Sequence, residues 1–291
     1  MKCSKIIILL ITIIFHSCED NKYSAHTPSY IEINHFKYDG NTNTNKPHPL
    51  QYQSTNITDG WISMNGEVIG VFEMPCQVPI LSEGLHSFDI YPGIKVNGIA
   101  GNRAKYPFYN KFEIDVELIK DQVIPIYPTT SYHKNVTKIF ETQGTFEQPG
   151  TMFERVNDND TVPIRQNYEV FQGQYSTAIY LDSVKNKFEI RNIDELELPL
   201  NSFMELDFKS NISFNIGLII INSGNIPIKE ELIQLYPTES WKKIYLDLYP
   251  LINLGNNNSK YKIYIDGQYN DLVIKNAIYI DNLKLVHNNY D

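Results

Sequence analysis

The sequence predicts an all-β protein made of two β-sandwich domains in tandem, which follow a short export segment. Residues that favour strands are abundant: the 291 residues include 20 Tyr and 14 Phe, and Ile, Val and Thr recur in short runs between turn residues. No long stretch repeats apolar residues at helical spacing. The length suits two domains of ordinary size better than one.

The first 17 residues have the order of a cleaved export signal. Lys2 and Lys5 precede an apolar run over residues 6–15, and the small residue Ser17 follows it. This run is too short to cross a bilayer as a helix, which needs about 20 apolar residues. We therefore expect residues 1–17 to be removed, and they are left out of the predicted fold.

Cys18 stands directly after Ser17, and this arrangement resembles the lipobox of bacterial lipoproteins, in which the cysteine becomes the first mature residue and carries acyl chains. Two positions before Ser17 depart from the usual pattern, as in lipoproteins of the Bacteroidetes group. Glu19 and Asp20 resemble the tag that sends such lipoproteins to the cell surface. The resemblance implies an outer-membrane lipoprotein, anchored through Cys18 and facing the cell exterior. The alternative is an ordinary signal peptide and a free thiol at Cys18.

Composition limits the partners of the mature chain. Without Lys2 and Lys5 the formal charge falls from −9 to −11, and such an acidic chain does not attract nucleic acid or anionic lipid. Cys3 leaves with the signal and Cys18 would be acylated, so Cys76 has no intrachain partner. No disulfide framework is expected, and stability must come from burial of apolar side chains.

Residues 18–28 are polar and are expected to form a tether, and the first domain is expected over residues 29–133. Its clearest element is a hairpin over residues 61–72, in which two strand-like runs flank an Asn-Gly pair that favours a two-residue turn. Residues 111–118 alternate apolar and polar side chains, as a half-buried strand does.

The order of these elements resembles the PEGA domain, a small immunoglobulin-like sandwich of prokaryotic surface proteins. The resemblance covers residues 59–126 and departs from the family at its namesake tetrapeptide, where Ser82-Glu83-Gly84-Leu85 stands. It implies a module without catalytic residues. It rests on the Asn65-Gly66 turn, Gly70, Pro75, Pro79, Glu83-Gly84-Leu85-His86 and Pro92-Gly93.

An insertion relative to that family, residues 94–109, combines cations with aromatic side chains. Such a loop can stack on or hydrogen-bond to a partner, so we predict that it is a partner-binding loop. The alternative is that its aromatic rings pack onto the sandwich edge while its arginine pairs with a local acid. The residues concerned are Arg103, Lys105, Tyr106, Phe108 and Tyr109.

A linker is expected over residues 134–140 and a second domain over residues 141–291. About eight short runs of strand-forming residues, separated by turns, predict another β-sandwich. The expected strands lie at residues 170–181, 187–190, 203–208, 213–221, 241–248, 261–265 and 277–286.

Parts of this second half resemble jelly-roll domains of the carbohydrate-binding and galactose-binding-like kind. The pieces are Phe146-Glu147, residues 173–176, residues 241–248 and residues 278–283. In such domains an acid of the first strand and an aspartate of the last often share a structural calcium ion. The resemblance therefore implies calcium at Glu147 and Asp281, whose oxygens suit that ion. The alternative is that both acids cap strand ends or pair with lysines.

Sugar binding and glycosylation give further candidate residues. Flat exposed rings can stack on a sugar, although each ring could instead pack in the core; the candidates are Tyr168, Tyr175, Tyr236 and Tyr269. Two Asp-Ser/Thr-apolar triplets resemble O-glycosylation sites of Bacteroidetes secreted proteins. They imply attached sugars at Thr161 and Ser183.

Enzyme motifs are not found in the sequence. The seven histidines show no pair at zinc-ligand spacing, and no Gly-x-Ser-x-Gly elbow occurs. Glycoside hydrolysis needs two carboxylates that flank a cleft, and residues such as Glu154 and Asp158 are candidates only because an acidic chain always offers some. We therefore predict a protein that is not an enzyme.

These observations favour a binding or scaffold subunit of an outer-membrane protein complex, with the insertion docked on the partner. The alternative is a surface lipoprotein whose jelly roll captures glycan, and a glycoside hydrolase is less favoured. No cofactor is expected other than structural calcium. Exposed aromatic side chains clustered on the second domain would favour glycan, whereas a flat apolar patch on the first would favour protein.

Overall fold

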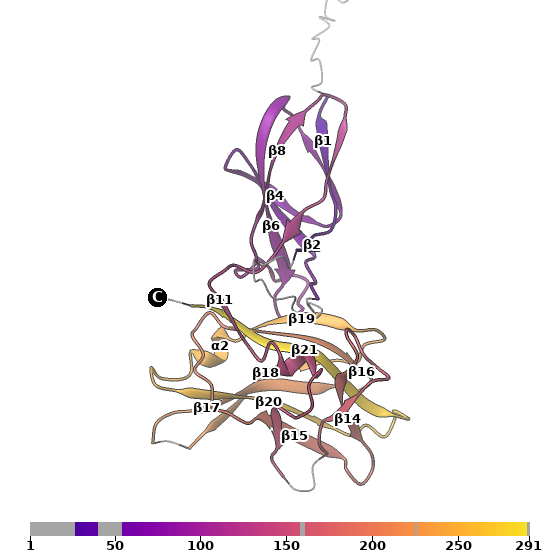
Figure 1. Cartoon of the computed structure of the whole chain (residues 1–291), viewed down its shortest axis with the longest axis vertical. Helices are drawn as coiled ribbons and strands as arrows, with labels where there is room; N and C mark the ends of the chain where they lie inside the picture. Colours follow the sequence, from indigo (N-terminus) through magenta and orange to yellow (C-terminus); the bar gives the residue numbers. More distant parts are fainter. Residues whose placement is uncertain (1–26, 40–53, 158–160, 225, 290–291) are drawn as a thin grey trace, which may run out of the picture.

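A computed structural model describes residues 27–39, 54–157, 161–224 and 226–289. The chain is nearly all β, and its strands form a narrow first domain that stands on one face of a broader, two-layered second domain (Figure 1). The predicted all-β fold class is confirmed. Within the described ranges, no helix is long and apolar enough to pass through a membrane.

The described residues of the first domain form ten strands in three small sheets. Their orders are β5-β1-β9, β10-β2, and β4-β3-β6-β7 with β8 also paired to β6. The strands are β1 (Ser29–Ile33), β2 (Lys37–Tyr38), β3 (Asp59–Met64), β4 (Glu67–Glu73), β5 (Cys76–Ile80), β6 (Gly84–Lys95), β7 (Arg103–Lys105), β8 (Phe112–Leu118), β9 (Val123–Ile126) and β10 (Thr129–Thr130).

The predicted hairpin is confirmed in detail. β3 and β4 pair antiparallel across Asn65 and Gly66, whose φ angles are 52° and 83°. Positive φ at both central positions matches the right-handed twist of the flanking strands, which is why Asn-Gly is favoured there. The alternating strand predicted at residues 111–118 is β8, with Val116 and Leu118 buried.

The second domain is a sandwich of two sheets. The sheet next to the first domain, here called the proximal sheet, has the order β13-β14-β21-β16-β19, with β11 also paired to β21; the distal sheet has the order β12-β15-β20-β17-β18. The elements are β11 (Val136–Ile139), η1 (Gln143–Thr145), β12 (Phe153–Arg155), β13 (Ile164–Gln166), β14 (Ser176–Leu181), β15 (Lys187–Asn192), β16 (Phe203–Ser210), β17 (Phe214–Ile221), β18 (Ile228–Leu235), β19 (Lys242–Asp247), α2 (Tyr249–Ile252), β20 (Lys260–Gln268) and β21 (Asn276–Asn288).

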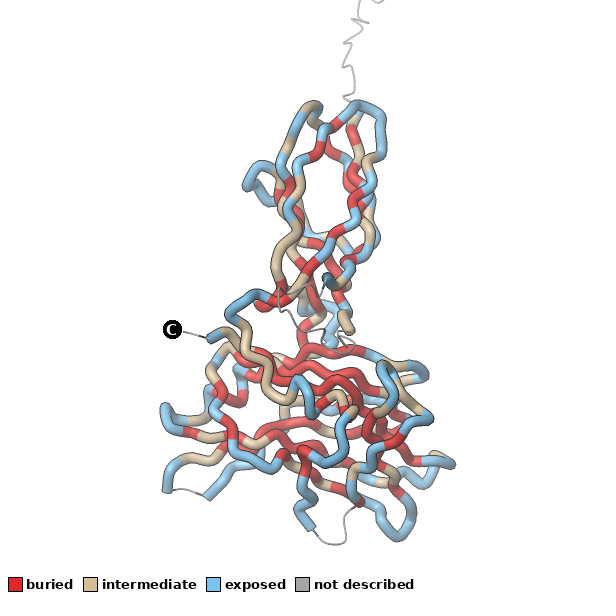
Figure 2. Tube along the Cα trace, viewed as in Figure 1, coloured by how far each residue is buried: buried red, intermediate tan, exposed pale blue. Residues whose placement is uncertain are grey.

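Apolar side chains from both sheets fill the space between the layers. Leu206 on β16, Leu218 on β17 and Ile263 on β20 are completely buried, and Figure 2 shows that the central strands of this domain are buried along most of their length. The expected linker 134–140 differs from the prediction, because it contains β11, which pairs with β21. The two domains are therefore joined without a free spacer.

Candidate functional site

The aromatic residues of the insertion lie between the two domains. Tyr106, Phe108 and Tyr109 are at most 3% exposed. The ring centroid of Tyr106 is 5.6 Å from that of Phe203 on β16 and 4.7 Å from that of Tyr245 on β19. The expectation that these three rings face an external partner is corrected, because this chain's own second domain covers them.

The two cations predicted to contact a partner, Arg103 and Lys105, are also engaged within the chain. Arg103 pairs with the buried Asp59, and its Nη2 lies 3.3 Å from Oε2 of Glu73. The ammonium of Lys105 lies 3.7 Å from the centroid of the Tyr91 ring, a cation–π contact. Arg103 therefore pairs with local acids, as the alternative interpretation expects.

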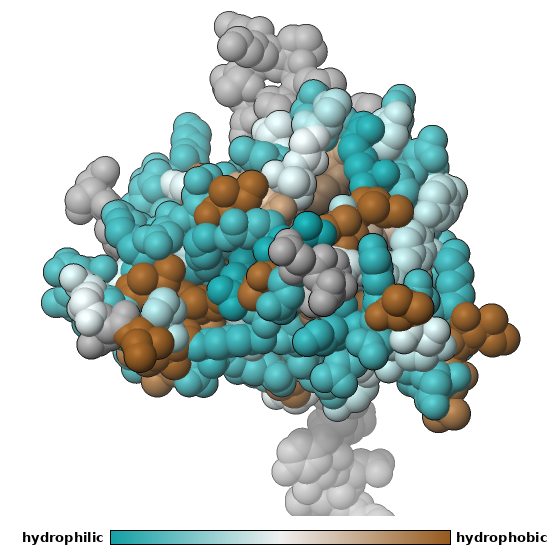
Figure 3. Space-filling view, turned by 90° about the horizontal axis from the view of Figure 1, so that it is seen from below, coloured by the Kyte–Doolittle hydropathy of each residue, from teal (hydrophilic) through white to brown (hydrophobic). Residues whose placement is uncertain are grey.

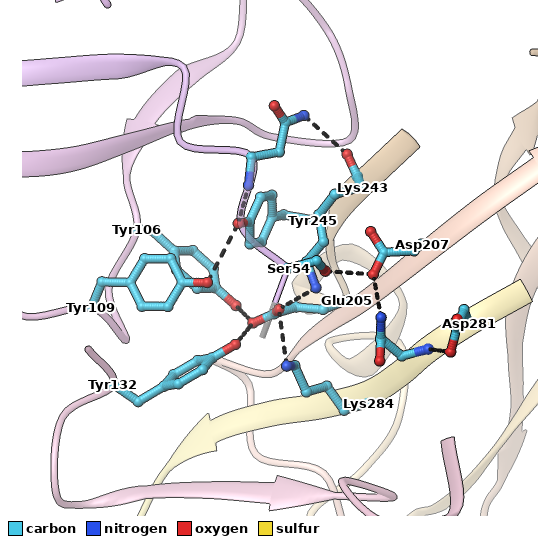
Figure 4. A network of polar contacts seen from close by, with 12 residues as sticks. Ser54, Tyr106, Tyr109, Tyr132, Glu205, Asp207, Lys243, Tyr245, Asp281 and Lys284 are labelled. Atoms are coloured by element: carbon cyan, nitrogen blue, oxygen red, sulfur yellow. Dashed lines mark hydrogen bonds and ion pairs between the residues drawn. The ribbon is translucent and has the colours of Figure 1, made fainter. Parts of the chain in front are cut away.

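A buried charged network joins the domains (Figure 4). Glu205 on β16 is completely buried, and its Oε1 accepts hydrogen bonds of 2.6 Å from the hydroxyls of both Tyr106 and Tyr132 of the first domain. Its Oε2 lies 2.9 Å from Nζ of Lys243 and 3.7 Å from Nζ of Lys284. One carboxylate thus holds two tyrosines of one domain and two lysines of the other.

The ionisation of this network follows from its geometry. Burial opposes the charge of Glu205, but Lys243, Lys284 and the two tyrosine hydroxyls outweigh it and hold the pKa of Glu205 at about 2. Burial also opposes the charge of Lys243, but the neighbouring carboxylates of Glu205 and Asp207 outweigh it and raise the pKa of Lys243. Burial prevails at Lys284 and lowers its pKa to about 8, because this ammonium lies farther from Glu205 and is repelled by Lys243.

Hydrogen bonds of backbone groups also connect the first domain to the second. The N–H of Asn97 donates to the carbonyl of Tyr245 at 2.8 Å, and Oδ1 of Asn97 accepts the N–H of Asp247 at 2.9 Å. The N–H of Asn56 donates to the Tyr245 hydroxyl at 3.0 Å. The first domain therefore covers part of the outer face of the proximal sheet, whereas the distal sheet lies at the opposite end of the molecule (Figure 1).

A row of polar side chains crosses the outer face of the distal sheet. Its members are direct cross-strand partners on β15, β20, β17 and β18, so they project from the same face: Glu189, Asp266, Asn215 and Gln234. Nδ2 of Asn215 donates to Oδ1 of Asp266 at 3.0 Å, and Nε2 of Gln234 donates to Oδ1 of Asn215 at 3.1 Å. We call these four residues the polar row.

Lys229 bridges the two carboxylates of the polar row. Its Nζ lies 2.6 Å from Oε2 of Glu189 and 2.6 Å from Oδ2 of Asp266. Partial burial opposes the charge of Glu189, but hydrogen bonds from Lys229 and Arg191 outweigh it and lower the pKa of Glu189. Both carboxylates of the row are therefore neutralised by cations.

A glycine shapes the neighbouring surface. The ring of Tyr264 lies across β17 at Gly217, where a Cβ atom would be 2.6 Å from Cε1 of that ring and 2.2 Å from the carbonyl oxygen of Glu230. Any larger residue would displace the ring or the strand, which explains a glycine inside a strand. The ammonium of Lys229 lies 4.3 Å from the centroid of the same ring.

The polar row borders a cleft of about 690 Å³ at one end of the distal sheet. Figure 3 views this end of the molecule, where hydrophilic residues cover most of the surface and hydrophobic residues form separate small groups. Amide and carboxylate side chains in the cleft can each bond to a hydroxyl group. Besides the polar row, the lining includes Lys187, Gln268, Tyr269, Asn270 and Asp271.

The four tyrosines predicted to stack on sugar do not form one platform. Tyr269 lines the cleft and packs partly against the core, and the exposed Tyr236 follows β18 two residues after Gln234. The guanidinium carbon of Arg165 covers the Tyr175 ring at 3.1 Å from its centroid. Tyr168 is exposed elsewhere, and its hydroxyl contacts that of Tyr180.

Tyr168 belongs to an aromatic surface beside the proximal sheet, here called the side patch. The ring of Phe171 lies 5.8 Å from the Trp241 ring, and Nε1 of Trp241 donates to Oε1 of Glu169 at 2.9 Å. The ring of Tyr180 lies 6.1 Å from that of Tyr279. Of these rings, Tyr168 and Phe171 are exposed, Tyr180 and Trp241 are partly exposed, and Tyr279 is buried. The side patch consists of Tyr168, Phe171, Tyr180, Trp241 and Tyr279.

The two acids of the predicted calcium site hold the same loop by its backbone. Oε1 of Glu147 accepts the N–H groups of Gln174 and Tyr175 at 2.9 and 3.1 Å, and Oδ2 of Asp281 accepts the N–H of Gln172 at 3.1 Å. In the described ranges, no group of three or more His, Cys, Asp or Glu side chains could hold a metal ion. Both acids thus accept hydrogen bonds from backbone N–H groups of the loop before β14, and calcium stays a prediction.

Burial and hydrogen bonding change the pKa of Asp281 in opposite directions. Burial raises the pKa of Asp281 to about 8, well above the usual value for an aspartate, because its effect exceeds that of the backbone hydrogen bonds, which lower the pKa. The folded protein therefore gains stability from Asp281 below about pH 4 and loses it as the pH rises through about 8, by at most about 1.4 kcal/mol per pH unit. Asp281→Asn is expected to remove this dependence, so urea unfolding at pH 5 and pH 8 should show a smaller pH effect in the variant. Equal pH effects in both proteins would contradict the assignment.

The two predicted glycosylation sites differ in how far they are exposed. Thr161 is only 8% exposed as a residue, which disfavours a sugar on its hydroxyl, and its glycosylation stays a prediction. Ser183 is exposed in a turn that Asp182 holds through the N–H groups of Val184 and Lys185, and its glycosylation stays a prediction. Cys18 and Asp158 lie outside the described residues.

No protein-family model matches this sequence, and no curated protein sequence matches it. Among solved structures, it is similar to a carbohydrate-binding module of the β-sandwich superfamily studied for promiscuous specificity, with 13% identity over 78% of this chain and 84% of that chain and a TM-score of 0.38. A family 61 carbohydrate-binding module in complex with β-1,4-galactotriose shows 18% identity, coverage of 52% and 94%, and a TM-score of 0.31. A variant of a family 29 module complexed with cellulohexaose shows 13% identity, coverage of 53% and 92%, and a TM-score of 0.34.

Proposed function

We propose that this protein binds carbohydrate in the cleft beside the polar row. The observation that carries the proposal is the continuous line of planar amides and carboxylates across four strands, from Glu189 to Gln234, at the rim of an open cleft. A sugar hydroxyl can donate one hydrogen bond and accept another, so it can pair with amide groups, which do both, and with carboxylates, which accept. Tyr269 adds an aromatic ring to this mostly polar lining, which suits a ligand that carries many hydroxyl groups.

The charges of the cleft favour binding over hydrolysis. A glycosidase needs a carboxylic acid whose pKa is raised, so that it can protonate the leaving group. Glu189 and Asp266 do lie near each other, but Lys229 bridges them and the pKa of Glu189 is lowered. Glu154, another candidate from the sequence, pairs with Lys262 at 2.8 Å. The proposed function is therefore capture of a sugar without its cleavage.

The proposed location is the outer surface of the outer membrane, with an anchor on Cys18. The first described residues and the distal sheet lie at opposite ends of the molecule (Figure 1). An anchor that precedes β1 would therefore leave the cleft on the side away from the membrane. This orientation supports a role in catching soluble or cell-wall glycans outside the cell.

A glycan array followed by calorimetry with the best oligosaccharide tests the proposal. Asn215→Ala removes the central amide of the polar row, and we expect it to weaken binding about tenfold, since one or two hydrogen bonds are lost. Gln77→Ala, an exposed strand residue of the first domain, is the matched control and should leave affinity unchanged. Absence of array binding, or equal affinity of the two variants, would remove the proposal.

A second candidate function is a subunit of an outer-membrane protein complex. It ranks second, because exposed rings such as Phe171 and Tyr168 lie on the second domain, where they favour glycan, and the rings of the first domain's insertion are buried. Recovery of a specific partner by crosslinking on intact cells, with no binding on the array, would place this candidate first.

A further inference from the structure

Four aliphatic side chains are exposed at the end of the first domain that lies farthest from the second domain. They come from two loops and the strand ends beside them, and we call them the tip: Leu81, Leu85, Ile119 and Val123, with exposed fractions of 74%, 68%, 45% and 49%. Scattered exposed apolar residues are ordinary, whereas a group at one end of a domain marks a contact surface.

Backbone contacts show that the two loops are neighbours. The Ser29 hydroxyl contacts the carbonyl oxygen of Ser82 at 2.9 Å, and the carbonyl oxygen of Pro28 accepts the N–H of Asp121 at 3.1 Å. In addition, Leu85 on β6 is the cross-strand partner of Glu117 on β8. The tip therefore surrounds the point at which the chain enters the first domain.

We infer that the tip rests on the surface of a lipid bilayer. The inference depends on the proposed anchor at Cys18, which lies nine residues before Thr27, the first described residue. Nine residues span at most about 32 Å. Lipid chains on Cys18 would therefore keep the tip within that distance of the membrane, at a high effective concentration. The exposed aliphatic side chains therefore lie at the same end of the first domain as the segment that leads to the proposed anchor.

The charges around the tip specify the kind of lipid. Glu83, Glu117 and Asp121 are exposed beside it, against one exposed cation, Lys120. This negative balance repels an anionic surface but not a zwitterionic one. The partner surface is therefore a zwitterionic bilayer, into which the aliphatic side chains insert at the headgroup level.

The test uses the mature chain from Cys18 with Cys76→Ser, coupled through Cys18 to a maleimide lipid in phosphatidylcholine vesicles that contain brominated acyl chains. Leu85→Trp places a fluorophore in the tip, and Leu272→Trp, at a position 89% exposed in the second domain, is the matched control. We expect the brominated lipid to quench Leu85→Trp and not Leu272→Trp. Equal emission losses in the two variants, or none, would overturn the inference.

A second reporter separates apolar insertion from mere proximity. Ile119→Trp should also be quenched, and Leu81→Ser with Leu85→Ser in the same chain should abolish that quenching while circular dichroism stays unchanged. Persistent quenching would mean that the aliphatic side chains do not insert. Because the lipid is coupled chemically, these results do not depend on acylation in cells, which mass spectrometry of Cys18 tests separately, nor on sugar binding, which calorimetry measures on the same protein.

Discussion

Glu205→Ala is expected to lower the free energy of unfolding by about 3–5 kcal/mol, because it leaves buried charge without a partner. Lys243 and Lys284 would face each other across the space that the carboxylate occupied, and the hydroxyls of Tyr106 and Tyr132 would lose their acceptor. Denaturant unfolding followed by circular dichroism measures the effect.

Glu205→Gln separates charge from shape in the same network. The amide keeps an oxygen for the tyrosine hydroxyls but not the negative charge, so we expect a loss between those of the parent protein and Glu205→Ala. The pKa of Glu205 is about 2, below the ordinary glutamate value of 4.5, so its stabilisation is complete above about pH 4.5 and disappears as the pH falls toward 2. An alanine variant that loses less than about 1 kcal/mol would show that the network contributes little to stability.

Gly144→Ala is expected to destabilise the second domain by about 3 kcal/mol or more. Gly144 lies in η1, which packs against β21, and a Cβ atom there would be 1.7 Å from the carbonyl oxygen of Leu283. The neighbour is backbone in a central strand, so no side-chain rotation relieves the clash. Thermal unfolding of the variant should show a lowered midpoint.

Gly101→Ala is the matched control for that experiment. A Cβ atom at Gly101 would meet nothing within 4 Å. We expect this variant to unfold like the parent protein. Similar midpoints for the two alanine variants would contradict the packing of η1 on β21 described above.

The sequence predicts best where local chemistry decides the structure. Asn65-Gly66 fixes a turn by its own dihedral preference, and the regular alternation of residues 111–118 identifies β8. β18 could not be predicted in this way: it is an edge strand, largely exposed, and a register irregularity opposite Ile216 and Gly217 interrupts its alternation. β11 is not distinguished from a linker by its sequence, because four half-buried residues carry little pattern.

Short stretches of sequence do not show which side chains are buried where two domains meet. The rings of Tyr106 and Tyr109 look like exposed loop residues in the sequence, and only the facing strand β19 makes them core. Glu205 gives no such signal either, because polar and apolar residues alternate along β16 and the sequence places Glu205 on the polar face. The polar row was not predictable, since its four members are contributed by strands far apart in the chain.

The position of β21 has a consequence for biosynthesis. This strand lies between β14 and β16 in the proximal sheet, pairs with β11 as well, and carries Lys284 of the interdomain network. The sheet cannot be completed before residues up to 288 have left the ribosome. Until then the apolar surfaces that pack against the last strand stay uncovered, so the second domain cannot fold completely while the chain is still being synthesised.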